Sequence, residues 1–413
     1  MFDGYRDLLS RPGARSFTFA GFVSRLIIPM FNISLILMIQ IQYDSYAIAG
    51  QVAAIGVFVW AAQTVPTARL VDRFGQRAAM WPLVALHVAG TVIAVATSML
   101  RGPVPFLWVA VVFASLSGPV GSLTRARWSH ILTTEQEIHS AFSLEGALDE
   151  VLFVGGPLVA TVLTTSVHPA AGILTASAAL VVGMGILLPQ TASEPPARRG
   201  TGGGGLGLRV PRPVIAVTLV STAMGLIFGA FDISVVAFAD SLGLKPWAGA
   251  VLGVVAFGSF LGSLAYGARR WRWPMWARIV VASGIVAVGF SVVSLQSGLV
   301  ALAIVGFFAG SAIAPLFATS DAITQRSVRR DQLTEGLAWS RIGIGVGVGI
   351  GAWLGGGLIE SEGARAGLHF SGGAAILVAF TALATIPWLR AVGRRRVREA
   401  DVLVDPSPVP PNI

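Results

Sequence analysis

Six ionisable side chains interrupt long apolar stretches of this sequence, where little water would reach them. They are Arg25, Glu145, Asp149, Glu150, Asp232 and Arg341. A charge in such a setting is costly unless a counter-charge or water meets it, so it is treated first as a functional candidate. The chemistry that these groups offer is ion pairing and proton exchange.

Glu145 and Asp149 are four residues apart, so a helix places both on one face. At a rise of 1.5 Å per residue, Asp149 and Arg25 lie at similar depths, about 15 Å and about 13 Å from the cytoplasmic ends of their helices. We therefore predict that Asp149, with Glu145 or Glu150, exchanges a proton. Its ion-pair partner would be Arg25 or Arg341, and a static pair that only orients the helices is the alternative.

Asp232 stands apart from the other five, among mostly apolar sequence neighbours. Such neighbours favour the uncharged form of a carboxyl group, which can then take up and release a proton. Asp232 is therefore a second candidate proton carrier.

The remaining residues offer little other chemistry. Cys is absent and the five His are dispersed, so we expect no metal site, no cofactor and no clustered catalytic set. The sequence predicts a protein that is not an enzyme.

The elements that carry these charges are membrane-spanning helices. The chain has 413 residues, of which 54% are hydrophobic and 12% are charged, against about 25% charged in soluble domains. Apolar runs of roughly 20 residues match the thickness of a bilayer. They predict an all-α integral membrane protein with twelve spans: 17–41, 45–66, 78–100, 103–124, 139–163, 169–189, 213–238, 246–268, 277–297, 299–320, 332–358 and 366–389.

The loops between the spans predict the orientation. Most of the 29 Lys and Arg residues fall on the side that carries both termini, which makes that side cytoplasmic. The net charge of +9 is then explained by these loops in the cell membrane, and we expect no nucleic-acid partner. The lipid bilayer itself is the expected surrounding partner.

The chain divides into two similar halves. Residues 190–212 are rich in Gly, Pro and Arg and predict a flexible cytoplasmic linker between six-helix bundles at 1–189 and 213–389. Segments around Ala68 and Gly156 match segments around Gly262 and Gly351 at a nearly constant offset. This predicts parallel repeats with a substrate path between them. Residues 390–413 form a basic tail that we expect to be disordered.

The loop after the second span reads ARLVDRFGQR over residues 68–77. It resembles the loop motif of the major facilitator superfamily, with Ala68 in place of the first Gly. The resemblance implies the major facilitator fold of two pseudo-symmetric six-helix bundles. It also implies a monomeric secondary transporter that works by alternating access.

The residues of this motif have separate expected roles. Gly75 permits a tight turn, and Arg73 and Arg77 hold the loop at the anionic inner surface, unless they only set the topology. Asp72 is expected to be buried or half-buried. The resemblance implies that Asp72 pairs with other helix ends across the halves and locks the outward-facing state. Candidate partners of Asp72 are Arg125 and Arg127.

Glycine patterns suggest close helix packing or sliding between the halves. Gly155-Gly156-Pro157 in the fifth span partly resembles the antiporter pattern of the family. In the eleventh span the glycines recur every four residues, at Gly347, Gly351 and Gly355, and so share one helix face. Ser115 stands where drug–proton antiporters of the family carry an arginine.

The spans hold few amide groups, which disfavours a sugar substrate. Aromatic and aliphatic side chains along the path suit an apolar or amphipathic small molecule. We therefore predict proton-coupled export of a drug or secreted metabolite, as in efflux-based antibiotic resistance. The alternative is uptake or facilitated transport of a small organic anion, with Arg25 and Arg341 as carboxylate clamps.

Overall fold

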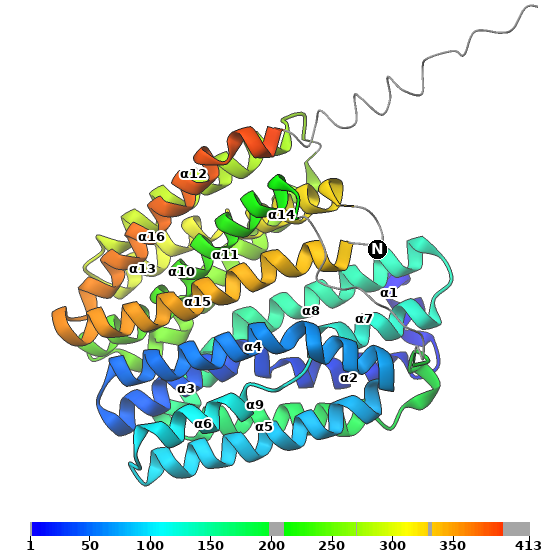
Figure 1. Ribbon diagram of the computed structural model, residues 1–413, viewed down its shortest axis with the longest axis horizontal. Helices are drawn as coiled ribbons and strands as arrows, with labels where there is room; N and C mark the ends of the chain where they lie inside the picture. The colour runs from blue at the N-terminus through cyan, green and yellow to red at the C-terminus, as the bar shows by residue number, and fades with distance from the viewer. Residues whose placement is uncertain (1, 198–209, 270, 329–332, 391–413) are drawn as a thin grey trace, which may run out of the picture.

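The computed structural model describes residues 2–197, 210–269, 271–328 and 333–390. Within these residues the chain forms helices and no strand. The helices lie roughly parallel or antiparallel in two layers, with the first half of the chain in one and the second half in the other (Figure 1).

The first half contains α1 (Phe2–Ser10), α2 (Ala14–Arg25), α3 (Ile27–Tyr43), α4 (Tyr46–Phe74), α5 (Gln76–Met99), α6 (Val104–Ala114), α7 (Val120–Ile131), α8 (Glu135–Val162) and α9 (Ala171–Leu187). The second half contains α10 (Arg212–Ser241), α11 (Ala248–Ala268), α12 (Met275–Ser294), α13 (Leu299–Gly310), α14 (Ile313–Ser327), α15 (Leu333–Glu362) and α16 (Ala364–Ala384).

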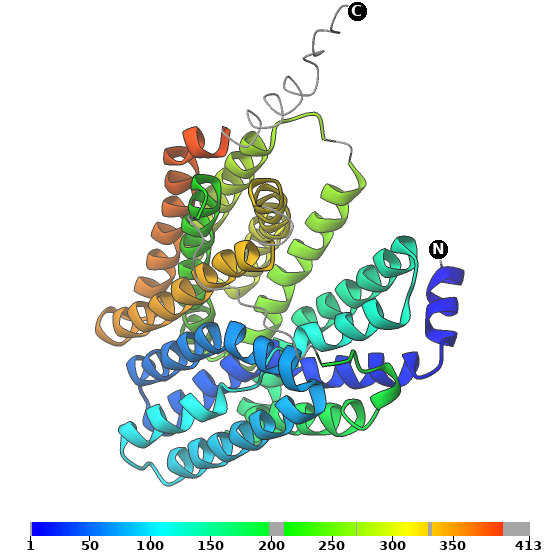
Figure 2. The same cartoon turned by 45° about the vertical axis from the view of Figure 1, so that its right-hand side comes forward.

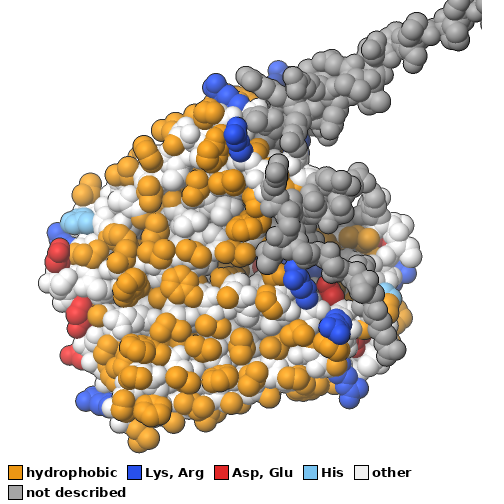
Figure 3. Space-filling view, in the orientation of Figure 1, with side chains coloured by type: hydrophobic (Ala, Val, Ile, Leu, Met, Phe, Trp, Pro, Cys, Tyr) orange, Lys and Arg blue, Asp and Glu red, His pale blue; other side chains and the backbone are white. Residues whose placement is uncertain are grey.

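These helices confirm the predicted membrane-spanning architecture. Ten helical segments of the described chain are long and apolar enough to cross a bilayer, and the shorter apolar helices α6 and α9 lie within two further predicted spans. Hydrophobic side chains cover the middle of the molecule and charged ones gather at its two ends (Figure 3). Side chains such as Val300 and Phe380, which are 75% and 64% exposed, need lipid rather than water around them.

Local side-chain chemistry determines where several helices begin and end. The hydroxyl of Ser45 accepts a hydrogen bond from the backbone of Ile48 and caps α4 at 3.1 Å. Thr134 caps α8 in the same way through the backbone of Glu137. At the other end of α4, Gly75 has a φ of 88°, a left-handed value that glycine adopts without strain.

The predicted span 103–124 is wrong in one respect, because it is not a continuous helix. The helix stops after Ala114 and restarts at Val120. Gly118 has a φ of 71°, and Pro119 follows it without a backbone donor. The carbonyl of Ala114, which has lost its helical partner, is met by the buried ring of His87 from α5.

The tenth span is interrupted at the corresponding place. Here α13 ends at Gly310 and α14 begins at Ile313. Ser311, in this break, and Pro315, in the first turn of α14, have the same spacing as Ser115 and Pro119, the first and last residues of the fourth-span break. The two breaks therefore extend the internal repeat from sequence to structure, and interrupted helices in matching positions of two halves point to a transport path.

The two halves meet at one end of the molecule and diverge at the other. The end at which α1 begins and α16 ends is called the termini end below (Figure 1, Figure 2). The halves separate toward this end. At the opposite end, the backbone and hydroxyl of Tyr46 donate to Glu360 at 2.8 Å and Asp240 at 2.9 Å, and Lys245 donates to Gln40 at 2.5 Å.

The predicted glycine faces serve different contacts. A Cβ at Gly347 or Gly351 would collide with backbone carbonyls of α10, so these glycines pack α15 tightly within its own half. A Cβ at Gly355 would lie 3.2 Å from the Cα of Ala230 in α10, a tight contact without a carbonyl collision. Gly156 lies against Pro29 of α3, whereas Gly155 faces open space and makes no close approach.

Glycines on α11 bring the two halves together beside α8. A Cβ at Gly249 would collide with the carbonyl of Pro157, and one at Gly253 with the carbonyl of Val154. Pro157 therefore lies at the interface between the halves, with the glycines that admit it on the partner helix.

The predicted linker 190–212 is described only at its two ends, and the predicted tail lies outside the described residues from 391 onward. The first residues of the linker are bound to the first half of the chain. Arg127 donates to the carbonyl of Gln190 at 2.7 Å and to the hydroxyl of Ser193 at 2.8 Å. A carboxylate oxygen of Glu194 accepts a hydrogen bond from the backbone of Arg77 at 3.1 Å.

Replacing Gly351 with Ala should destabilise the protein, because the new methyl group must push α15 away from α10. Overpacking of this kind costs about 1–3 kcal/mol. The measurement is thermal unfolding in detergent, with Gly357→Ala as the matched control, since Gly357 faces open space on the same helix. Equal melting temperatures for the two variants would contradict the packing role.

Candidate functional site

The candidate site is a cluster of charged side chains from α2, α7 and α8, in the part of the first half nearest the termini end. Arg25 is the last residue of α2. The chain cannot continue this helix undisturbed, because Pro29 has no N–H to donate to the carbonyl of Arg25. Gly21 lets α7 approach α2 closely, since a Cβ there would collide with Thr124.

Arg25 is completely buried and pairs with two carboxylates. Its Nη2 lies 2.5 Å from Oε2 of Glu145, and its Nη1 lies 2.8 Å from Oδ1 of Asp149. Its Nε donates to the carbonyl of Gly21 at 3.1 Å. A guanidinium held on three sides in this way is fixed in position, and its charge is compensated without water.

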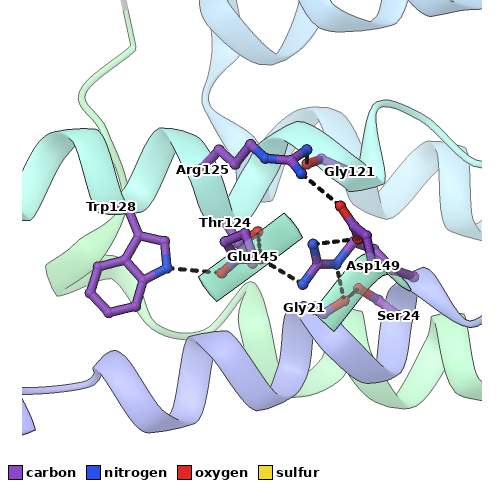
Figure 4. Close-up of polar contacts among 9 residues, drawn as sticks. Gly21, Ser24, Gly121, Thr124, Arg125, Trp128, Glu145 and Asp149 are labelled. Atoms are coloured by element: carbon purple, nitrogen blue, oxygen red, sulfur yellow. Dashed lines mark hydrogen bonds and ion pairs between the residues drawn. The ribbon is translucent and has the colours of Figure 1, made fainter. Parts of the chain in front are cut away.

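Asp149 bridges two arginines. Its second carboxylate oxygen lies 2.6 Å from Nη2 of Arg125, whose Nη1 donates to the carbonyl of Gly121 at 3.0 Å. Figure 4 shows Asp149 of α8 between α7, which carries Arg125 above it, and α2, which carries Gly21 and Ser24 below it. The side chains of Asp149 and Arg125 are 24% and 36% exposed. This side of the cluster is therefore open to its surroundings, unlike the side of Arg25.

Glu145 forms the closed side of the cluster. It is fully buried and accepts hydrogen bonds from Trp128 Nε1 at 2.8 Å and from the hydroxyl of Thr124 at 3.1 Å (Figure 4). The ring of Trp128 is held by an edge-on contact with Phe17 at 4.7 Å. Glu145 therefore has a partner on each carboxylate oxygen and forms a fully satisfied buried contact with Arg25.

The structure brings together three of the six predicted intramembrane charges. Arg25, Glu145 and Asp149 form the cluster, as the sequence predicted for their pairing. Three others lie elsewhere. Glu150 is partly buried one residue along α8, and Arg341 is exposed on α15 in the other half. The prediction that Arg341 could replace Arg25 as the partner of Asp149 is therefore not met in this conformation, since Arg25 and Arg125 occupy both oxygens.

Asp232 lies partly buried on α10 and makes no ion pair or hydrogen bond within the described part of the chain. Asp232 lies in the second half of the chain, whereas the cluster lies in the first half. Its role as a second proton carrier stays a prediction.

The structure corrects two predictions about the loop motif, namely the burial of Asp72 and its partners. Asp72 is exposed rather than buried, because the halves diverge at the termini end (Figure 2). Its predicted partners are occupied elsewhere: Arg125 binds Asp149, and the buried Arg127 donates to Gln76 Oε1 at 2.8 Å. Arg73 stacks on the ring of Phe74 at 5.1 Å.

Sequence reasoning missed the roles of Arg125, Thr124 and Trp128 in this cluster. A signal was present, because Trp128 follows Thr124 by four residues and Arg125 by three, which makes it a neighbour of both on a helix surface. It was obscured because Arg125 was assigned to the cytoplasmic loop as a partner of Asp72.

A cavity of about 200 Å³ lies close to the cluster between the halves. α3, α4 and the broken fourth span line one side, and α15 lines the other. Most of its walls are apolar, including Phe31 and Trp60, and its polar groups come from Asn32, Ser115 and Ser117. The hydroxyl of Ser115 is buried without a hydrogen-bond partner. This cavity suits a mainly apolar molecule with one or two hydrogen-bonding groups.

No protein-family model and no curated protein sequence matches the chain, but solved structures match its fold. The nucleoside transporter NupG has a TM-score of 0.69 at 12% identity, over 90% of this chain and 99% of its own. A bacterial homologue of the iron transporter ferroportin in an inward-facing state gives 0.71 at 13%, over 90% and 98%. PepTSo, a transporter of the POT family, gives 0.72 at 10%, over 92% and 98%.

At these identities the likeness establishes the fold. The chain has the twelve-helix fold of the major facilitator transporters, as predicted from its spans and its loop motif.

Replacing Glu145 with Gln should destabilise the protein strongly, because it leaves the buried Arg25 with one carboxylate instead of two. Removing one partner of a buried ion pair costs about 3–5 kcal/mol. Thermal unfolding in detergent measures the loss. The control is Glu137→Gln, which removes the exposed ion pair with Arg11 and should change little. A small effect at Glu145 would show that the cluster is hydrated.

Proposed function

We propose that the protein is a secondary active transporter of the cell membrane that exports apolar or amphipathic small molecules in exchange for protons. The observation that carries this proposal is the bridging carboxylate of Asp149, held between the buried Arg25 and the partly exposed Arg125. A group so placed can change its charge without unfolding the bundle.

Asp149 accepts from arginines through both oxygens, an arrangement that fits the ionised carboxylate. A proton on Asp149 would weaken both contacts and leave an excess positive charge on the exposed side, while Glu145 keeps Arg25 paired. Protonation therefore loosens α7 from α8 at the cluster, which supports a coupling between proton uptake and helix movement.

The conformation fits a transporter open to the cytoplasm. The predicted orientation makes the termini end cytoplasmic, and the halves diverge there (Figure 2). The opposite end is closed by contacts of Tyr46 and Gln40 with the second half. Outward opening requires that these hydrogen bonds break, and the approach of the halves at the termini end would bring the exposed Asp72 toward the second half.

The cavity supports the solute class. Its walls are apolar and its hydrogen-bonding groups are uncharged, since they come from Asn32, Ser115 and Ser117. A sugar or a multiply charged solute would leave its polar groups without partners there.

The organic-anion alternative has weaker support. The human organic anion transporter MFSD10 shares the fold with a TM-score of 0.58 at 13% identity, over 90% of this chain and 100% of its own. The predicted carboxylate clamp, however, needs donors of Arg25 that already bind Glu145 and Asp149. A small anion would have to displace one of these carboxylates.

Replacing Asp149 with Asn should abolish proton exchange, because the amide cannot take up or release a proton at neutral pH. Inverted membrane vesicles carrying the protein are challenged with hydrophobic cations, neutral drugs and organic anions while lumenal pH is recorded. Wild type and the Glu137→Gln control should respond to hydrophobic compounds and Asp149→Asn should not. Proton movement that survives in Asp149→Asn, with protein levels equal, would refute the assignment.

The absence of Cys allows the resting conformation to be tested directly by a single introduced thiol. Asn32→Cys, in the cavity wall, should react with an impermeant thiol reagent from the cytoplasmic side. Adding Tyr46→Phe and Glu360→Ala removes hydrogen bonds at the closed end. At about 1 kcal/mol for each of the two bonds, labelling from outside should rise about 30-fold. Unchanged labelling would mean that these contacts do not hold the end closed.

A further inference from the structure

A second cavity, of about 560 Å³, opens on the second half between α11 and α12 and has α13 and α14 as its floor. It shares no lining residue with the cavity between the halves. Its lining changes character along its length, from arginine and tryptophan near the α11–α12 loop to aliphatic and phenyl groups toward the middle of the spans.

The polar end of this groove holds a cation in a built position. Arg278 donates from Nη1 to the hydroxyl of Tyr266 at 3.0 Å, and that hydroxyl lies 2.8 Å from the hydroxyl of Thr319. The Nε of Arg278 is buried and has no hydrogen-bond partner. No ion pair is formed by Arg278 with an acid of the described segments, so its charge is uncompensated.

A second cation and two indole rings stand beside it. The guanidinium of Arg269 stacks over the ring of Trp271 at 5.0 Å, and Trp271 donates to the carbonyl of Tyr266 at 2.8 Å. Trp273 packs against Trp271 at 6.1 Å and is 52% exposed. Tryptophan and arginine together are typical of the level at which lipid headgroups lie.

The apolar part of the groove continues from these groups along the spans. Leu261, Val281 and Ile285 line it and are 40%, 44% and 48% exposed. The floor includes Ser311 and Pro315, at the break of the tenth span, and Gly262 lets α11 lie directly on the carbonyl of Ser311. The groove therefore combines an apolar channel along the spans with two arginines, Arg269 and Arg278, at its polar end.

We propose that this groove is a binding site for one anionic phospholipid of the leaflet at the termini end, with the phosphate on Arg278 and Arg269 and an acyl chain along Leu261, Val281 and Ile285. Charge complementarity selects the lipid, because Arg278 and Arg269 form no ion pair with an acid of the described residues and line the polar end of the groove. The aliphatic walls exclude a soluble anion as the full occupant. The bound lipid braces the break of the tenth span. The site does not depend on proton coupling or on the exported solute.

The full-length protein in detergent is titrated with phosphatidylglycerol or phosphatidylcholine, and bound lipid is counted by native mass spectrometry. Wild type should retain phosphatidylglycerol in preference to phosphatidylcholine. The double variant Arg269→Gln/Arg278→Gln should bind phosphatidylglycerol about 30-fold more weakly, given the contribution of each arginine near an anionic lipid. Arg272→Gln is the matched control, because Arg272 is exposed in the same loop and does not line the groove.

A second pair of variants tests the acyl channel without touching a charge. Ala265→Trp fills the groove and should release the lipid, whereas Ala268→Trp, on the same helix outside the groove, should not. Since Ala265 is exposed, this variant also serves if the arginine double variant fails to fold. Added inorganic phosphate should not displace the lipid.

Three results would overturn the proposal. They are equal binding of the two lipids by wild type, unchanged binding of phosphatidylglycerol in both the double variant and Ala265→Trp, and displacement by inorganic phosphate, which would indicate a site for a free anion instead.

Discussion

The burial of the Arg25 guanidinium constrains the whole first half of this protein. A cation with no exposed surface must be met by anions and acceptors in fixed places, or the bundle would not hold together. Glu145, Asp149 and the carbonyl of Gly21 supply them, which positions α8 against α2. Two cations and two anions then balance in the cluster, so the first half carries a neutral core in which one member, Asp149, is partly exposed.

The interrupted fourth and tenth spans are the second structural theme. A helix break inside a bilayer frees backbone groups that lipid cannot hydrogen-bond. Such breaks therefore occur only where the backbone is buried in protein or lines a cavity. On one side of the fourth-span break, His87 contacts the carbonyl of Ala114, and on the other side the break lines the cavity between the halves. The tenth-span break forms the floor of the groove between α11 and α12. In each half, a weak point of the helix thus faces a space that a ligand could occupy.

The two halves contribute different parts of the candidate site. The first half carries the titratable cluster and most of the lining of the central cavity. The second half contributes α15, whose opposite faces pack closely against α10 and against α4. Glycines on two faces of α15 let α10 and α4 approach it closely, and Gly50 of α4 lies against the backbone of Ala352 in α15. Rocking of one half on the other would pass through this contact, with Tyr46 and Glu360 as its latch at the closed end.

Length and charge along the chain were enough to predict the spans, the repeat and the depth of Arg25, Glu145 and Asp149, because each depends only on residues close in sequence. They could not show that Arg125 would complete the cluster or that Asp72 would be exposed. Depth supplies one coordinate along the membrane normal, whereas pairing needs the rotation and lateral position of every helix as well. Likewise, a run of apolar residues from 103 to 124 reports hydrophobic length and not helical continuity. The sequence by itself therefore determined which segments form apolar helices long enough to cross a membrane and which of these helices carry charges. Only tertiary packing decided which charges meet, where the helices break and which end is closed, since those outcomes depend on contacts between segments far apart in the chain.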